Sequence, residues 1–294
     1  MSKMVLSIVM FLFFSAHYLF ADIKAVTTTT VIYDIVKEIG KEKVQADYLC
    51  RGDQDPHFLE VMPKYMVKLR NADLFFKIGM GLELWAQQLI DGSRNEKLKV
   101  IDLSNDIRKK EVPAGKIDAS LGDVHPYGNP HYWLDPANAL IMANEIYTAL
   151  SNQSPKDEPF FKKNLDDYSA RLKTKIDEWT KKMEPLKGKS IVFFHASWIY
   201  FAERYGLKIA GYVEPKPGIA PTPSHNAELY KIIKSNNVRY IMMENFYSDN
   251  APNQIANATG VKVIKVPTAV YGIQGVNSYI QMMDNIISQL VKTT

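Results

Sequence analysis

Three histidines follow stretches with the composition of β-strands, and neutral imidazole is a good ligand for zinc, copper, iron and nickel. His57 lies in DQDPHFLEVMP, His131 in GNPHYWLDP and His195 in IVFFHASW. Because ligands of open α/β sheets bind outside the carboxyl ends of the strands, side chains at such positions can converge. The spacings of 74 and 64 residues match no compact zinc motif, and a single histidine after a strand is more often a structural hydrogen-bonding group.

The residues before two of these histidines indicate stiff loops. Pro56 directly precedes His57, and Pro130 directly precedes His131. Proline fixes its own φ angle and restricts the residue before it, so the backbone ahead of each imidazole has little freedom. A stiff loop suits a site that must hold a metal ion without folding around it.

Two further histidines lie in other settings. His125, in GDVHPYGNP, could lead a metal toward His131, but we interpret it as a surface loop residue. His225, in TPSHNAEL, lies near the expected start of a helix, where a role in the cap region is favoured over metal ligation.

Strand-like and helix-like segments alternate along the first part of the chain. Such alternation predicts a mostly parallel sheet with helices on its faces. Residues 105–130 are rich in proline and glycine and are expected to form a loop. The expected strands are 23–27, 44–49, 74–78 and 100–103, and the expected helices are 31–40, 61–71 and 82–91.

A second alternating set follows two helices, 137–151 and 160–183. The latter is polar with a narrow apolar stripe, which is typical of a partly exposed connecting helix, and it would be about 36 Å long. The later expected strands are 190–194, 208–212, 240–243 and 261–266, and the later expected helices are 199–205, 225–235, 253–259 and 277–292.

The chain is therefore predicted to be an α/β protein with two Rossmann-like lobes of mostly parallel sheet, joined by a long backbone helix. We place a signal peptide at 1–21, the N-terminal lobe at 22–156, the connecting helix at 157–186 and the C-terminal lobe at 187–294.

The first 21 residues are typical of a secretory signal peptide. Lys3 provides a positive start, residues 4–14 are apolar apart from Ser7, and Ala21 is a small residue before a polar one. The apolar run is shorter than the roughly 20 residues that span a bilayer, so we expect an exported, periplasmic protein rather than an anchored one.

The composition is that of a globular protein, with 46% hydrophobic and 23% charged residues. The net charge of +4 comes from interspersed residues, so no basic stripe indicates a nucleic-acid partner. Cys50 is the only cysteine and cannot form an internal disulfide; we expect a half-buried structural thiol at a strand end.

Five strings occur in order along the chain, and together they resemble the successive signatures of the zinc- and manganese-binding solute-binding proteins of ABC transporters (the cluster A-I or cluster 9 family). The resemblance covers essentially the whole chain after the signal peptide. It implies two α/β lobes joined by a rigid helix, with the metal in the cleft between them. The strings are DPHFLEVMP, NADLFFKIGMGLELW, GNPHYWLDP, FFHASWIYFAERYGL and EPKPGIAPTPSHNAELYKII.

The resemblance implies that His57, His131 and His195 are the first three metal ligands. The fourth family ligand is usually an aspartate in a late loop, but the corresponding residues 266–279, VPTAVYGIQGVNSY, contain no carboxylate. Glu244, at the end of the strand YIMME, is our first candidate for the fourth ligand. Asp249 is the second candidate, and water is the alternative to both.

Zinc is the favoured metal, because three imidazoles and one oxygen match a tetrahedral zinc site. Manganese prefers harder oxygen ligands and is the main alternative; iron and copper are further ones. The family resemblance implies a monomeric protein that captures the ion between its lobes and delivers it to the membrane permease of an ABC importer, which reads the closed form.

Other classes of protein could use the same residues. A zinc metalloenzyme could employ three histidines with Glu244 as a general base, but the sequence has no nucleophile elbow, P-loop or HExxH motif, so we expect no enzymatic activity. A sugar- or amino-acid-binding protein of similar architecture would make the histidine positions incidental. An adhesin built on the same scaffold is a further alternative.

Overall fold

The computed structural model describes residues 23–115, 122 and 125–292. The predicted signal peptide, residues 1–21, lies outside the described residues. Within them, no helix is both long enough and apolar enough to cross a membrane.

The first sheet has four parallel strands in the order β2-β1-β3-β4. Its helices begin where the sequence favours them; Pro63, for example, is the first residue of α2. The strands are β1 (Ile23–Thr27), β2 (Val44–Tyr48), β3 (Leu74–Lys77) and β4 (Lys99–Asp102), and the helices are α1 (Thr30–Gly40), α2 (Pro63–Arg70) and α3 (Ala86–Ser93).

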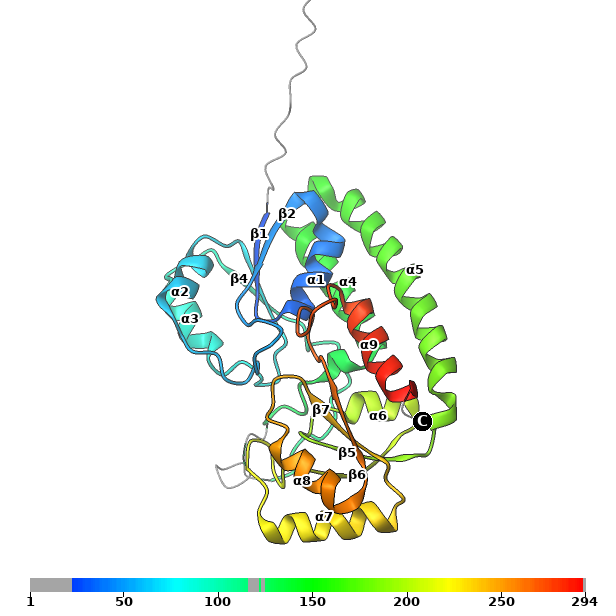
Figure 1. Cartoon of the computed structure of the whole chain (residues 1–294). Coiled ribbons are helices and arrows are strands. Elements are labelled where there is room, and N and C mark those ends of the chain that lie inside the picture. Colours follow the sequence, from blue (N-terminus) through cyan, green and yellow to red (C-terminus); the bar gives the residue numbers. More distant parts are fainter. Residues whose placement is uncertain (1–22, 116–121, 123–124, 293–294) are drawn as a thin grey trace, which may run out of the picture.

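The second sheet repeats this arrangement, with four parallel strands in the order β6-β5-β7-β8. Figure 1 shows the two sheets in opposite halves of the molecule. We call the halves the N-terminal and C-terminal lobes. The strands of the second sheet are β5 (Ser190–Phe193), β6 (Lys208–Tyr212), β7 (Tyr240–Glu244) and β8 (Lys262–Val266), and its helices are α6 (Ile199–Tyr205), α7 (Pro223–Ser235) and α8 (Asn250–Thr259).

Three helices run between or beside the lobes: α4 (Pro136–Gln153), α5 (Glu158–Met183) and α9 (Tyr279–Lys292). Helix α5 is about 39 Å long by the usual rise per residue, and it extends along one side of both lobes in Figure 1. Its buried residues recur at helical spacing and form one stripe facing the protein: Phe161, Leu165, Tyr168, Leu172, Trp179 and Met183.

One hydrophobic core runs through both lobes. It contains strand residues of both sheets, such as Phe76 and Phe193, together with apolar residues of α4, α5 and α9. Helix α9 contacts α5, β8 and α1, so the end of the chain packs against both lobes. The lobes are therefore held by a shared core as well as by the connecting helix.

The predicted fold class is confirmed: two parallel sheets with flanking helices are linked by a long helix. The expected helix at 82–91 forms later, at Ala86–Ser93, because the residues before it turn back toward β3, where Glu83 accepts hydrogen bonds from the backbone N–H groups of Ile78 and Gly79. The domain boundaries given above remain a prediction.

A buried carboxyl joins α1 to α9. Asp34 Oδ2 accepts a hydrogen bond from the backbone N–H of Tyr279 at 2.8 Å, and Asp34 is 8% exposed. Burial raises the pKa of Asp34 to about 6. The native state therefore binds this proton more tightly than the unfolded chain does. The resulting stability is fully present below about pH 4 and is lost as the pH rises through 6.

Replacing Asp34 by Asn should flatten this part of the pH dependence. The ionisable group contributes roughly 2 kcal/mol to the change in unfolding free energy between pH 4 and pH 6.5, and the amide contributes none. Urea unfolding of both proteins at the two pH values measures the difference. The assignment is wrong if wild type and Asp34→Asn lose the same unfolding free energy over this interval.

Candidate metal centre

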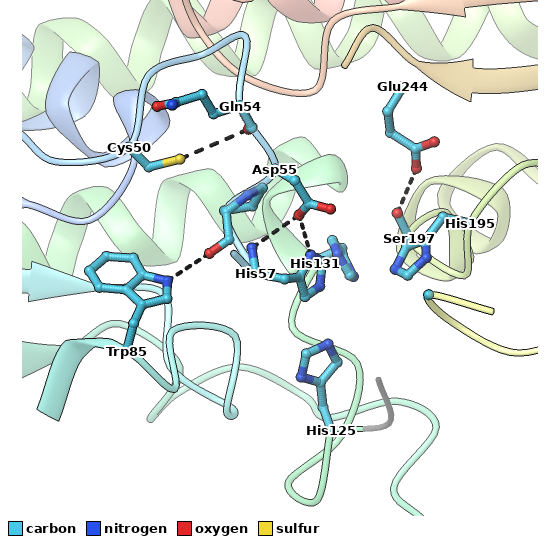
Figure 2. A network of polar contacts seen from close by, with 12 residues as sticks. Cys50, Gln54, Asp55, His57, Trp85, His125, His131, His195, Ser197 and Glu244 are labelled. Atoms are coloured by element: carbon cyan, nitrogen blue, oxygen red, sulfur yellow. Dashed lines mark hydrogen bonds and ion pairs between the residues drawn. The ribbon is translucent and has the colours of Figure 1, made fainter. Parts of the chain in front are cut away.

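The three predicted histidines lie together between the lobes. His57 lies in the loop after β2, His131 directly precedes the short helix η3 (Tyr132–Leu134), and His195 closely follows β5. Their exposed fractions are 8%, 4% and 3%. One ring nitrogen from each can be chosen so that all three lie within 4.8 Å of one another, and Figure 2 shows the rings facing a common centre.

The distances between the imidazole rings are close to those of a zinc site. Ring centroids are 5.2 Å apart for His57 and His131, 5.3 Å for His57 and His195, and 5.5 Å for His131 and His195. Zinc–nitrogen bonds of about 2.0 Å in a tetrahedron place the nitrogens about 3.3 Å apart. The donor nitrogens of the cluster lie within 4.8 Å of one another, so their separations need to shorten by at most about 1.5 Å to hold such an ion.

Asp55 orients the His57 ring. Its Oδ1 accepts hydrogen bonds from the backbone N–H of His57 at 3.0 Å and from Nδ1 of the same residue at 2.6 Å. The short loop DPH allows this because an aspartate side chain readily bonds to the backbone two residues later. Burial raises the pKa of Asp55, but the bond to His57 outweighs burial, and the net pKa lies below the usual value.

Asn129 orients the His131 ring in the same way. Its Oδ1 accepts from the backbone N–H of His131 at 3.0 Å and from Nδ1 at 2.9 Å. Its Nδ2 donates to Glu111 Oε2 at 2.8 Å and to the carbonyl oxygen of Ala196 at 2.5 Å. Because both of these partners are acceptors, the amide orientation is fixed. Ala196 directly follows His195, so Asn129 also links the ligand segments of the two lobes.

Glu214 orients the His195 ring. It follows β6, which lies next to β5 in the sheet, and its Oε2 accepts from His195 Nδ1 at 2.7 Å. Burial lowers the pKa of His195, but the bond to Glu214 and the nearby charge of Glu244 outweigh burial, so the net pKa is raised.

All three rings consequently offer the same atom to a metal. The oxygens of Asp55, Asn129 and Glu214 hold Nδ1, which leaves Nε2 for coordination. The Nε2 atom of His57 is buried and has no hydrogen-bond partner among the described residues. Burial and the neighbouring histidines hold the pKa of His131 well below its usual value, so its ring is neutral and retains the lone pair that a metal requires.

Glu244 ends β7, on the other side of β5 from Glu214. Its Oε1 accepts from Ser197 Oγ at 2.6 Å and from Trp198 Nε1 at 3.0 Å, while its Oε2 is buried without a hydrogen-bond partner among the described residues. Burial raises the pKa of Glu244. It is outside the group of donor atoms within 4.8 Å, and its role as a ligand remains a prediction.

The second candidate, Asp249, is exposed and directly precedes α8.

Three aromatic residues that accompany the predicted ligands are buried beside the cluster. Tyr132 donates to the carbonyl oxygen of Ile78, Trp133 to that of Thr268, and Trp198 to Glu244.

The structure corrects our interpretation of His125 as a surface residue. It is half-buried and its ring stacks on His57 with centroids 5.2 Å apart. His225 lies away from the cluster, as expected; its backbone N–H is capped by Thr222 Oγ1, and its Nε2 bonds to the carbonyl oxygen of Tyr212. Cys50 is buried at the end of the β2 segment.

The side chains that orient the rings were missed from the sequence. Asp55 and Asn129 each directly precede one of the two prolines, and their shared position two residues before a histidine was a usable signal. Glu214 begins the string EPKPGIAPTPSHNAELYKII, but nothing in that string links it to His195, because it is 19 residues away and approaches His195 through the pairing of β5 with β6.

Known proteins resemble this chain over most of its length. The family described as "Zinc-uptake complex component A periplasmic" matches residues 25–293. The zinc-binding lipoprotein AdcA of Streptococcus pneumoniae is 28% identical over 240 residues, covering 81% of this chain and 48% of that protein. The manganese ABC transporter substrate-binding lipoprotein PsaA of Streptococcus pneumoniae is 27% identical, covering 89% and 85%. The chain thus spans about half the length of AdcA.

Solved structures show the same fold. The crystal structure of ZnuA gives a TM-score of 0.80 at 22% identity, covering 92% of this chain and 98% of that one. A mutant structure of the laminin-binding adhesin Lmb from Streptococcus agalactiae gives 0.80 at 24% identity, covering 92% and 99%. The family match over residues 25–293 shows that this chain belongs to the zinc-uptake complex component A family.

Proposed function

We propose that this protein captures a transition-metal ion, with zinc favoured, and delivers it to the membrane permease of an ABC importer. The observation that carries the proposal is the cluster of His57, His131 and His195, three buried histidines whose donor atoms lie within 4.8 Å of one another. Family membership and the similarity to zinc- and manganese-binding lipoproteins support it.

The donor set favours zinc over manganese. Three imidazole nitrogens suit zinc, whereas manganese prefers carboxylate, carbonyl and water oxygens. The carboxylates of Asp55 and Glu214 act on the rings from behind, through Nδ1. They offset the charge of the ion without supplying it with oxygen ligands. Manganese remains the alternative cargo, since relatives of both kinds are similar to this chain.

The ion would join the two lobes. His57 and His131 belong to the N-terminal lobe, and His195 belongs to the C-terminal lobe. Binding would contract the cluster by an ångström or so, from nitrogen separations of up to 4.8 Å toward about 3.3 Å. Because the lobes share one core, we expect the lobe movement to be small, and the permease would read this closed form.

We further propose that the protein acts after export, in the periplasm, as a monomer that binds its cargo without catalysis. Two observations support export: the similar proteins AdcA and PsaA are lipoproteins, and the family is a periplasmic one.

Zinc should raise the melting temperature of the metal-stripped protein, because a ligand that binds only the native state stabilises it. At one hundred times the dissociation constant the gain is about 2.7 kcal/mol, or roughly 5–10 °C for a chain of this size. His195→Ala should abolish this rise, and His225→Ala, a histidine outside the cluster, should retain it. Scanning calorimetry with zinc, manganese or no metal measures the effect.

A wild-type protein that no transition metal stabilises would refute the proposal. If manganese stabilises it and zinc does not, the cargo is manganese.

Glu214→Gln should weaken zinc binding about 10-fold to 100-fold, because losing the negative charge behind His195 makes its imidazole a poorer donor. Competition with a chromogenic chelator measures the affinity. Glu178→Gln, which changes an exposed glutamate of α5, is the matched control. Equal affinities for the two variants would show that Glu214 only packs beside the ring.

Glu244 was predicted as the fourth ligand. We propose that its negative charge acts on the bound ion from the side of the C-terminal lobe. Its buried Oε2 has no hydrogen-bond partner among the described residues, whereas Oε1 is held by Ser197 and Trp198. Glu244→Gln keeps the shape and removes the negative charge, so zinc affinity should fall about 10-fold. An unchanged affinity in the same chelator competition would remove Glu244 from the site.

A further inference from the structure

His125 shares the arrangement of the three clustered histidines, and this similarity extends the site. Its Nδ1 lies 3.2 Å from the carbonyl oxygen of Gly81. A carbonyl oxygen only accepts hydrogen bonds, so Nδ1 carries the proton and Nε2 is the atom with a lone pair. In metal sites the ring nitrogen that does not bind the ion typically donates to a carboxylate or carbonyl oxygen.

His225 provides a contrast within the same chain. Its Nε2 is bonded to the carbonyl oxygen of Tyr212, so the nitrogen that the clustered rings present is occupied there. The geometry at His125 is therefore not common to every histidine of the described residues. It recurs at His57, His131 and His195, which hold Nδ1 against an oxygen in the same way.

The position of His125 fits a ligand on the outer side of the cluster. Its ring centroid is 5.2 Å from that of His57 and 6.1 Å from that of His131. It also lines a cavity of about 150 Å³ together with His131 and His195. Figure 2 shows its ring below the other imidazoles and directed toward them.

We propose that His125 is a fourth histidine ligand that completes the coordination of the ion on the side of this cavity. The proposal rests on the proposed function of metal capture. His125 is outside the group of donor atoms within 4.8 Å, so its ring must move inward when the ion binds. Four imidazoles satisfy tetrahedral zinc, and Glu244 then acts as a nearby charge rather than as a ligand.

The backbone at Gly81 supports the orientation of the ring. Gly81 has a φ angle of +86°, and a Cβ there would lie 3.3 Å from Pro126 Cδ and 3.9 Å from His125 Nδ1. Only glycine adopts this conformation readily, so the carbonyl group that holds His125 depends on the residue type at position 81.

X-ray absorption at the zinc edge tests the proposal, because multiple scattering from imidazole rings counts the histidine ligands. The samples are the protein without its predicted signal peptide, loaded with one equivalent of zinc. They are wild type and the variants His125→Ala, Glu244→Gln and His225→Ala. We expect four imidazoles in wild type, Glu244→Gln and His225→Ala, and three in His125→Ala. Zinc transfer to a chelator should also be at least about tenfold faster from His125→Ala, since one bond is missing.

Three imidazoles in wild type and an unchanged spectrum in His125→Ala would overturn the fourth-ligand proposal while leaving metal capture by three histidines intact. If an oxygen ligand of wild type is lost only in Glu244→Gln, the fourth ligand is Glu244. A wild-type protein that retains no zinc would instead refute the proposed function itself.

Discussion

The site depends on one repeated interaction, the hydrogen bond between a ring nitrogen and an oxygen behind it. Asp55, Asn129 and Glu214 each hold the Nδ1 atom of one histidine, so the Nε2 atoms are left to face one another. Three buried imidazole nitrogens that face one another without hydrogen-bond partners cost free energy, so the rings must be held in this orientation by other contacts. These bonds supply that orientation, and the low pKa of His131 shows how strongly burial favours the neutral ring.

The scaffold serves this interaction by bringing strand ends together. In the C-terminal lobe, the carboxyl ends of three neighbouring strands, β6, β5 and β7, lie close to Glu214, His195 and Glu244. Asn129 then connects the lobes, because one amide holds His131 and also donates to the carbonyl oxygen next to His195. A core shared by both lobes keeps the two halves of the site within reach of each other.

The sequence predicted the sheets and the long helix, because hydrophobic periodicity is a local signal. The grouping of three distant histidines was predicted from their strand-end positions together with the resemblance to metal-binding solute-binding proteins. The sequence did not predict Glu214, whose role arises from strand pairing, or the burial of His125, whose loop has no regular pattern. It also placed α3 four residues too early, since the hydrogen bonds that hold Glu83 against the end of β3 leave no mark in the apolar pattern. The fourth ligand stays a prediction, because it depends on contacts between segments far apart in the chain.

The most direct measurement is a crystal structure of the zinc-loaded protein, with anomalous diffraction recorded on both sides of the zinc absorption edge. The account predicts a single strong anomalous peak between the lobes, about 2.0 Å from the Nε2 atoms of His57, His131 and His195, with each Nδ1 still bonded to Asp55, Asn129 or Glu214. A peak bound elsewhere, or no peak between these three rings at full zinc occupancy, would contradict it.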